Sequence, residues 1–215
     1  MNIATRRVGI FRILAAVSVP VLVAVAISTA AAANGAAETS PMAVVKAAVN
    51  QALAIFRDSK TPLPQRRSKM RDLLAAHFDF AEMARSALGP HWQSLSEDKR
   101  KQFVDLFTAY VEYDFLNKIQ VYRDLSFQFL KQVPIAGGYA QVNTRVQQPG
   151  KDPATMNFSL KQEGSDWKVT DVLINGLSMV GGDRTQFGLV IDNVGFDALM
   201  SDLQSKRNEL EASVK

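Results

Sequence analysis

The sequence predicts an α+β fold in which helices pack on one face of a four-stranded antiparallel sheet. Apolar residues recur every three or four positions from residue 41 to about residue 122, which is the period of an amphipathic helix. From residue 125 to residue 174 they alternate with polar residues, which is the period of a half-buried strand. Helical spacing returns from about residue 185. A sheet with one apolar face must be covered, and the helices are the only cover that the chain offers.

Proline and capping residues mark the first two predicted helices. Ser40 can cap the first helix, and Pro41 suits its first position. Pro62 and Pro64 end this helix and begin the second, which continues through apolar residues to His77.

Two further helices are predicted before the strands. A short one opens at Asp79 and ends at Gly89, because glycine can adopt the left-handed conformation that closes a helix and Pro90 prevents its continuation. The longest helix begins after Ser96, with acidic residues in its first turn, and should run to about Tyr122.

Four alternating runs predict an antiparallel meander. They cover residues 125–129, 140–146, 156–160 and 167–174, and glycine or proline turns separate them. Asn175-Gly176 should end the sheet. A helix is then expected from about Thr185 to Asn193, followed by a last helix that begins at Phe196.

The first 33 residues have the pattern of a secretory signal peptide. A basic start, an apolar run at residues 13–27 and small residues up to Ala33 predict export and cleavage near Ala33. The alternative is a membrane anchor, if the apolar run extends to the length that spans a bilayer. We expect a flexible start at residues 34–40, one domain at residues 41–206 and a frayed tail at residues 207–215.

Charge and composition exclude several classes of function. The chain has 25 Lys and Arg against 21 Asp and Glu, and three of the arginines lie in the signal segment, so the remainder carries about one net positive charge. We therefore expect no nucleic-acid partner. The chain has no cysteine, and His77 and His91 do not form a paired ligand motif, so we expect no metal and no cofactor.

Catalytic motifs are also missing. Ser178 lies in a glycine-flanked segment that is one residue too long for a nucleophile elbow, and the parallel sheet that such an elbow needs is not predicted. We expect no catalytic residue and no enzyme. Two basic clusters, at residues 66–71 and 99–101, either approach lipid headgroups or form solvated helix faces.

Two separated signatures resemble a known family. Residues 88–96 read LGPHWQSLS and lead into Phe103 and Phe107, while residues 167–172 read WKVTDV, residues 175–180 NGLSMV and residues 184–187 RTQF. This order is similar to that of the MlaC family, also called the toluene-tolerance auxiliary family, of periplasmic phospholipid-binding proteins. The resemblance runs from about Pro41 to Lys206. The chain departs from the family at Gly181-Gly182-Asp183-Arg184, where the loop is more flexible than the family pattern.

The resemblance implies a function and a set of partners. It implies a curved sheet with an acyl-chain cavity between the sheet and the helices, and a periplasmic carrier of phospholipid. It further implies transfer between an outer-membrane lipoprotein complex and an inner-membrane ABC transporter with an MCE-domain subunit, a role in outer-membrane lipid asymmetry. We expect a monomer.

Periodicity, taken together with this expectation, predicts the residues that face the lipid. The predicted lining consists of Phe103, Phe107, Tyr110, Val142, Val146, Met156, Phe158, Leu160 and Val169. Two alternatives remain. The cargo could be another envelope lipid such as a hopanoid, or the fold could serve a small-molecule enzyme or an adaptor. A carrier predicts a cavity larger than the roughly 300–1,000 Å³ of ordinary ligand sites.

Overall fold

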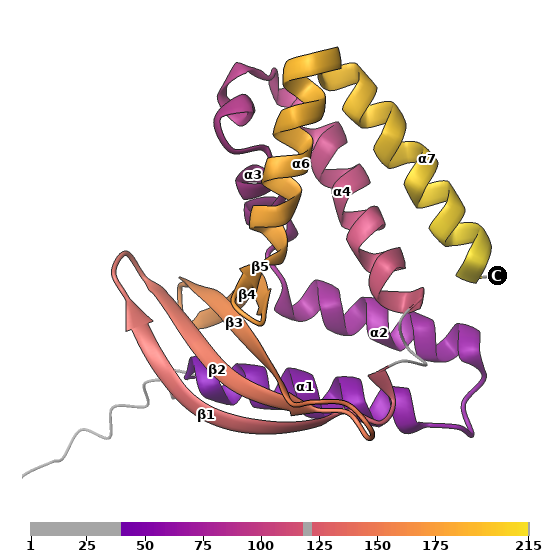
Figure 1. The fold of residues 1–215 in the computed structure, drawn as a ribbon, viewed down its shortest axis with the longest axis vertical. Coiled ribbons are helices and arrows are strands. Elements are labelled where there is room, and N and C mark those ends of the chain that lie inside the picture. Colours follow the sequence, from indigo (N-terminus) through magenta and orange to yellow (C-terminus); the bar gives the residue numbers. More distant parts are fainter. Residues whose placement is uncertain (1–39, 118–121, 215) are drawn as a thin grey trace, which may run out of the picture. The chain divides into compact units, whose positions relative to one another are not determined.

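The computed structural model describes residues 40–117 and 122–214, which all lie in the unit formed by residues 35–215. The predicted signal peptide and residues 34–39 of the predicted flexible start lie outside the described residues. The described chain has the predicted α+β class (Figure 1). Within it, no helix is both long enough and apolar enough to cross a membrane.

Helices come first and last in the chain order, with the strands between them (Figure 1). The helices are α1 Pro41–Arg57, α2 Leu63–His77, α3 Phe80–Leu88, the 3-10 helix η1 Gly89–Ser94, α4 Glu97–Asn117, α6 Met179–Val194 and α7 Phe196–Val214. Ser40 caps α1 as predicted, because its hydroxyl accepts a hydrogen bond from the backbone N–H of Ala43 at 3.1 Å.

The sheet is an antiparallel meander of five strands in the order β1-β2-β3-β4-β5. The strands are β1 Ser126–Ile135, β2 Tyr139–Gln147, β3 Ala154–Glu163, β4 Asp166–Ile174 and β5 Leu177–Ser178. The prediction of four strands missed β5. Asn175 and Gly176, with φ of 50° and 82°, form a tight turn that folds the chain back onto the end of β4 instead of ending the sheet.

A bulge in β4 corrects the phase of the strand. Leu160 pairs with Val169, but its neighbour Ser159 pairs with Asp171, so Thr170 is an extra residue. Because successive strand residues point to opposite faces, this insertion keeps Val169 and the later Val172 on one face. For this reason, inward-facing and outward-facing residues do not alternate strictly along the run Val169-Thr170-Asp171-Val172.

The helices form two groups with different neighbours. α1 contacts β1 and β2, whereas α2, α3 and α6 contact β4. Figure 1 shows α1 lying along the sheet. α4 packs against α7, α3 and α2, so the sheet is covered on one side and this cover is itself backed by a second set of helices.

Helix α6 begins at Met179, six residues before the predicted start at Thr185. Ser178 is its N-cap: the Ser178 hydroxyl accepts from the N–H of Gly181 at 2.7 Å and donates to Asp171 of β4 at 2.6 Å. The other Asp171 oxygen accepts from the N–H of Val180 at 3.1 Å. These bonds satisfy two of the N–H groups of the first turn, where Gly181 and Gly182 would otherwise weaken the helix. Ser178 is therefore a capping residue in this fold.

α4 is described to Asn117, and residues 118–121 of its expected continuation lie outside the described residues, so the helix end near Tyr122 stays a prediction. α7 stays helical to Val214, beyond the expected start of fraying at residue 207. Asn117 explains this, since its amide donates to the carbonyl of Leu210 at 3.4 Å and its side-chain oxygen accepts from the Ser213 hydroxyl at 3.1 Å.

Glu82 joins α3 to the sheet through ionic hydrogen bonds. Its carboxylate accepts from Arg85 at 2.7 Å and from Lys161 of β3 at 3.2 Å, and only 11% of the Glu82 side chain is exposed. Burial alone would raise the pKa of Glu82, but the hydrogen bonds and charges of Arg85 and Lys161 outweigh it and lower that pKa.

We expect Glu82→Gln to lower the free energy of unfolding at pH 7 by about 1 kcal/mol, because a charge-assisted hydrogen-bond pair is lost. A lowered folded-state pKa stabilises the fold above the unfolded pKa near 4.5 and loses this effect as the pH falls through the folded pKa. Urea unfolding at pH 7 and at pH 3 measures the difference. Glu209→Gln, at an exposed ion pair on α7, is the control. An equal loss at both pH values would contradict the electrostatic role of Glu82.

Candidate functional site

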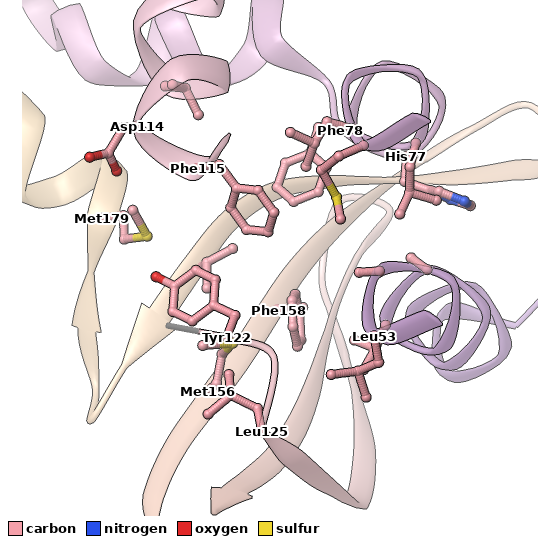
Figure 2. A pocket seen from close by; sticks show the side chains of 18 of the residues that line it. Leu53, His77, Phe78, Asp114, Phe115, Tyr122, Leu125, Met156, Phe158 and Met179 are labelled. Carbon is pink, nitrogen blue, oxygen red and sulfur yellow. The ribbon is translucent and has the colours of Figure 1, made fainter. Parts of the chain in front are cut away.

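An apolar cavity of about 140 Å³ lies between the helices and the sheet (Figure 2). Helices α1 and α2 form one side of it, α4 and Tyr122 lie opposite, and strands β1, β3 and β4 contribute the remaining wall. The lining residues are Ala48, Val49, Ala52, Leu53, Phe56, Met70, Leu73, Leu74, His77, Phe78, Phe80, Met83, Val111, Asp114, Phe115, Tyr122, Leu125, Phe127, Met156, Phe158, Val172, Ile174 and Met179.

Three of these lining side chains carry polar groups, namely His77, Asp114 and Tyr122. Figure 2 shows His77 and Asp114 on opposite sides of the cavity. Burial and then the positive charge of Lys168 lower the pKa of His77, so its imidazole is neutral at neutral pH. The interior is therefore almost entirely apolar and carries no convergent set of polar groups.

Three aromatic rings meet on one side of the cavity. The centroid of Phe56 lies 5.9 Å from that of Phe115 and 6.0 Å from that of Tyr122, and Phe115 and Tyr122 are 5.7 Å apart. Tilted rings at these distances attract each other by about 0.5–1.5 kcal/mol per pair. This side of the cavity is therefore formed largely by aromatic packing.

The cavity reaches solvent beside the start of α6. Ile174 and Met179 line the cavity and are also 37% and 42% exposed. Leu177, between them in the chain, is 77% exposed at the tip of the β4–β5 hairpin. An apolar rim thus continues the cavity wall onto the surface.

Acidic groups lie close to this opening. Burial, together with the nearby charges of Asp114 and Asp171, raises the pKa of Asp183 to about 6. Burial and the same acidic surroundings raise the pKa of Tyr110 to about 12. Tyr110 is therefore neutral at physiological pH, and Asp183 titrates near the lower end of that range.

Two of the nine predicted lining residues border the cavity, namely Met156 and Phe158 on β3. Phe103, Phe107 and Tyr110 lie instead in the contact between α4 and its neighbouring helices. The ring of Phe103 is 6.0 Å from that of Phe187 on α6 and 6.2 Å from that of Phe196 on α7. The ring of Phe107 stacks on that of Phe103 at 5.7 Å and is tilted by 50° relative to that of Tyr110 at 6.5 Å.

The other four predicted residues are buried in the sheet but do not border the cavity. They are Val142, Val146, Leu160 and Val169, and each is at most 6% exposed. α1 packs on β2, which carries two of them, and Val169 pairs with Phe78 in the linker before α3. Their inward orientation follows from alternation, but helices rather than the cavity cover them.

Sequence reasoning missed the share of α1 and α2 in the lining. Leu53, Phe56, Met70 and Leu74 all border the cavity. Their helical spacing shows that they face inward, yet periodicity does not distinguish a side chain packed on another from one beside a void. Within residues 40–117 and 122–214, no group of three or more metal-binding side chains is found.

Comparison with known proteins identifies related chains. The model of a family described as MlaC protein matches residues 46–205. The intermembrane phospholipid transport system binding protein MlaC of Haemophilus influenzae is 21% identical over 182 residues, which cover 80% of this chain and 85% of that protein. The solved phospholipid-binding protein from Ralstonia solanacearum, in complex with a phospholipid, superposes with a TM-score of 0.69 at 22% identity, over 79% of this chain and 98% of that one. The structural match supports the fold.

We expect Asp183→Asn to raise the melting temperature at pH 7 and to leave it unchanged below pH 3.8. A raised folded-state pKa means that the charged carboxylate destabilises the fold, and this penalty is complete above pH 6 and absent where both states are protonated. Thermal unfolding across this range measures it, with the exposed Asp202→Asn as the control. A variant that is destabilised at pH 7 would show that the carboxylate is held by favourable contacts.

Proposed function

Because the chain belongs to the MlaC family, we propose that it is an exported carrier that holds the acyl chains of a phospholipid in the cavity between its helices and its sheet. The proposal rests above all on the nature of the cavity wall, in which all but three lining residues are apolar. The Haemophilus influenzae relative, named as a phospholipid transport system binding protein, supports the same cargo.

The energetics of transfer favour such a wall. Two acyl chains carry roughly 30 methylenes, and each is worth about 0.8 kcal/mol when it leaves water. A bilayer offers nearly the same gain, so a carrier must match a bilayer in apolarity if loading and release are to be reversible. A charged cluster deep in the cavity would bias the lipid toward the membrane. The position of Asp114 and Asp183 near the opening is compatible with this requirement.

Loading requires the cavity to widen. Its volume of about 140 Å³ is below the 300–1,000 Å³ of ordinary ligand sites and below the size expected from the sequence for a carrier. Within the described chain, hydrogen bonds of α1 to other elements lie near its ends: the N–H of Met42 donates to Gln132, Arg57 donates to the carbonyl of Leu125, and the carbonyl of Phe56 accepts from Arg66. Between these ends the α1 residues that line the cavity are apolar, so the middle of α1 is held against the cavity by side-chain contacts and not by hydrogen bonds to other elements.

Lipid contacts follow from this geometry. Met156 and Phe158 would touch the chains directly, together with the α1 and α2 residues that line the cavity. The other seven predicted residues, Phe103, Phe107, Tyr110, Val142, Val146, Leu160 and Val169, would meet lipid only where the widening reaches them.

The cellular role is inferred from the N-terminal pattern and from the family. A signal peptide cleaved near Ala33 would deliver the protein to the periplasm. There it would act as a monomer and pass lipid between an outer-membrane lipoprotein complex and an inner-membrane ABC transporter with an MCE-domain subunit. The name of the Haemophilus influenzae relative, an intermembrane phospholipid transport system binding protein, supports this role.

A carrier function also fits the polar groups better than catalysis does. An enzyme needs convergent acid, base or nucleophilic groups, whereas His77 and Asp114 lie on opposite sides of the cavity (Figure 2). A hopanoid remains the alternative cargo.

Native mass spectrometry tests the proposal directly. We expect protein purified from a periplasm to retain one diacyl phospholipid, and lipid-stripped protein to regain it from labelled vesicles. Protein that is uniformly lipid-free and takes up no label would overturn the carrier function, and a retained hopanoid would correct the cargo.

We expect Ile174→Asp to reduce the lipid recovered with the protein at least about tenfold, because the charge would have to be desolvated beside the acyl chains. Ile174 lines the cavity but is already 37% exposed, so the free energy of unfolding should change little. Leu130→Asp is the matched control, since Leu130 is 49% exposed on β1 and does not border the cavity. Equal lipid recovery from the two variants would place the acyl chains elsewhere.

A further inference from the structure

Two arginines hydrogen-bond to the backbone of residues that line the cavity, and a third stands next to one of them on α2. The guanidinium of Arg66 donates to the carbonyl of Phe56 at 3.3 Å, and that of Arg57 donates to the carbonyl of Leu125 at 2.8 Å. Arg67 stands three positions before Met70 and seven before Leu74, so it shares the face of α2 that lines the cavity. The N-terminal part of the basic cluster at residues 66–71, which lies near the start of α2, therefore adjoins the cavity.

The hydrogen-bond donors of these side chains are largely unused. The Nε–H groups of Arg66 and Arg67 are buried and have no hydrogen-bond partner among the residues that the structure describes. A buried N–H without a partner is rare in native proteins and costs about 1–3 kcal/mol, so each such group calls for an acceptor. Each guanidinium carries five N–H groups. Arg57 donates twice and Arg66 once to backbone carbonyls, whereas no hydrogen bond of Arg67 is found in the described chain.

The positive charges are also not neutralised by ion pairs. None of Arg57, Arg66 and Arg67 forms an ion pair among the described residues, whereas the neighbouring Arg71 pairs with Glu112 at 3.3 Å and Arg123 with Asp124 at 3.6 Å. Burial and the adjacent charge of Arg66 lower the pKa of Arg67. The cluster thus presents uncompensated positive charge, partly removed from water, beside an apolar cavity.

We propose that Arg57, Arg66 and Arg67 form a binding site for a phosphate group, which on the proposed carrier function is the phosphodiester of the bound lipid. Phosphate oxygens accept several hydrogen bonds at once, and the planar fork of arginine matches them in pairs. Arg66 and Arg67 are half-buried, so the phosphate would sit at the edge of the cavity with the rest of the headgroup in water. The acyl chains would then pass Phe56 and Met70 into the interior.

This site makes the phosphate, and not only the acyl chains, a determinant of the cargo. We expect the protein to take a phospholipid in preference to a diacylglycerol with the same chains. The full-length chain, expressed with its N-terminal segment so that the cell can process it, is stripped of lipid and incubated with neutral vesicles that contain dioleoylphosphatidylcholine and dioleoylglycerol. The ratio of the two lipids in the reisolated protein is then measured by mass spectrometry.

The substitutions remove the donors without removing the cavity. Arg66→Gln with Arg67→Gln should lower the preference for the phospholipid about tenfold while diacylglycerol uptake is kept. Arg67→Gln alone leaves the bond from Arg66 to Phe56 in place and should lower the preference in part even if the double variant folds poorly. Arg67→Lys retains the charge and should lower it less than Arg67→Gln. Arg145→Gln with Lys151→Gln, at exposed positions on β2 and the following turn, removes the same charge and should change nothing.

The outcomes separate this site from the carrier function. Uptake of neither lipid by the unmodified protein would overturn the carrier function and the site with it. Uptake of both lipids with the same ratio in the unmodified and Arg67→Gln proteins would overturn the site alone. Repeating the assay in inorganic phosphate at constant ionic strength identifies the source of the anion: a fall in phospholipid preference means that free phosphate also binds, and no fall means that the site selects the lipid phosphodiester.

Discussion

The exclusion of water from one face of the sheet is the constraint on which the rest of the structure depends. The inner positions of β2 and β3, such as Val142 and Leu160, are fully buried, and α1 and α2 together with α3 provide the cover. A perfectly packed cover would leave no room for a ligand. Here large side chains of the helices and of the sheet, such as Phe56, Phe115 and Phe158, meet between the layers and leave an apolar cavity between them.

Polar interactions are placed so that they fix the periphery and leave the interior free. Glu82 joins α3 to Lys161 of β3, Asp171 joins β4 to the start of α6, and Arg57 joins the end of α1 to the chain before β1. Directional bonds at these positions determine the register of the elements, while the cavity wall is held by contacts that have no preferred direction. The arrangement combines a defined fold with an interior that can change its volume.

The class of fold and the order of the elements could be predicted because both follow from local periodicity and turn residues. Three features could not be predicted, because each depends on a particular contact that periodicity does not show. The start of α6 at Met179 is capped with the help of the Asp171 carboxylate, and the end of α7 is hydrogen-bonded to Asn117 of α4. Strand β5 is only two residues long and forms because a tight turn folds it back onto β4. The residues that line the cavity were harder to predict than the elements. Alternation showed that Val142 and Phe158 face the same side, but only packing in three dimensions decides that Phe158 borders the cavity and Val142 does not.

The extra residue Thr170 in β4 has a mechanical consequence. It leaves Val172 in the wall of the cavity while the preceding residue, Asp171, holds the N-terminus of α6. A single strand therefore lines the cavity and, through the hydrogen bonds of Asp171, holds the start of a helix that leads into α7. The placement of α6 thus depends on the same strand that forms the cavity wall, so the packing of the interior and the position of the C-terminal helices are not independent.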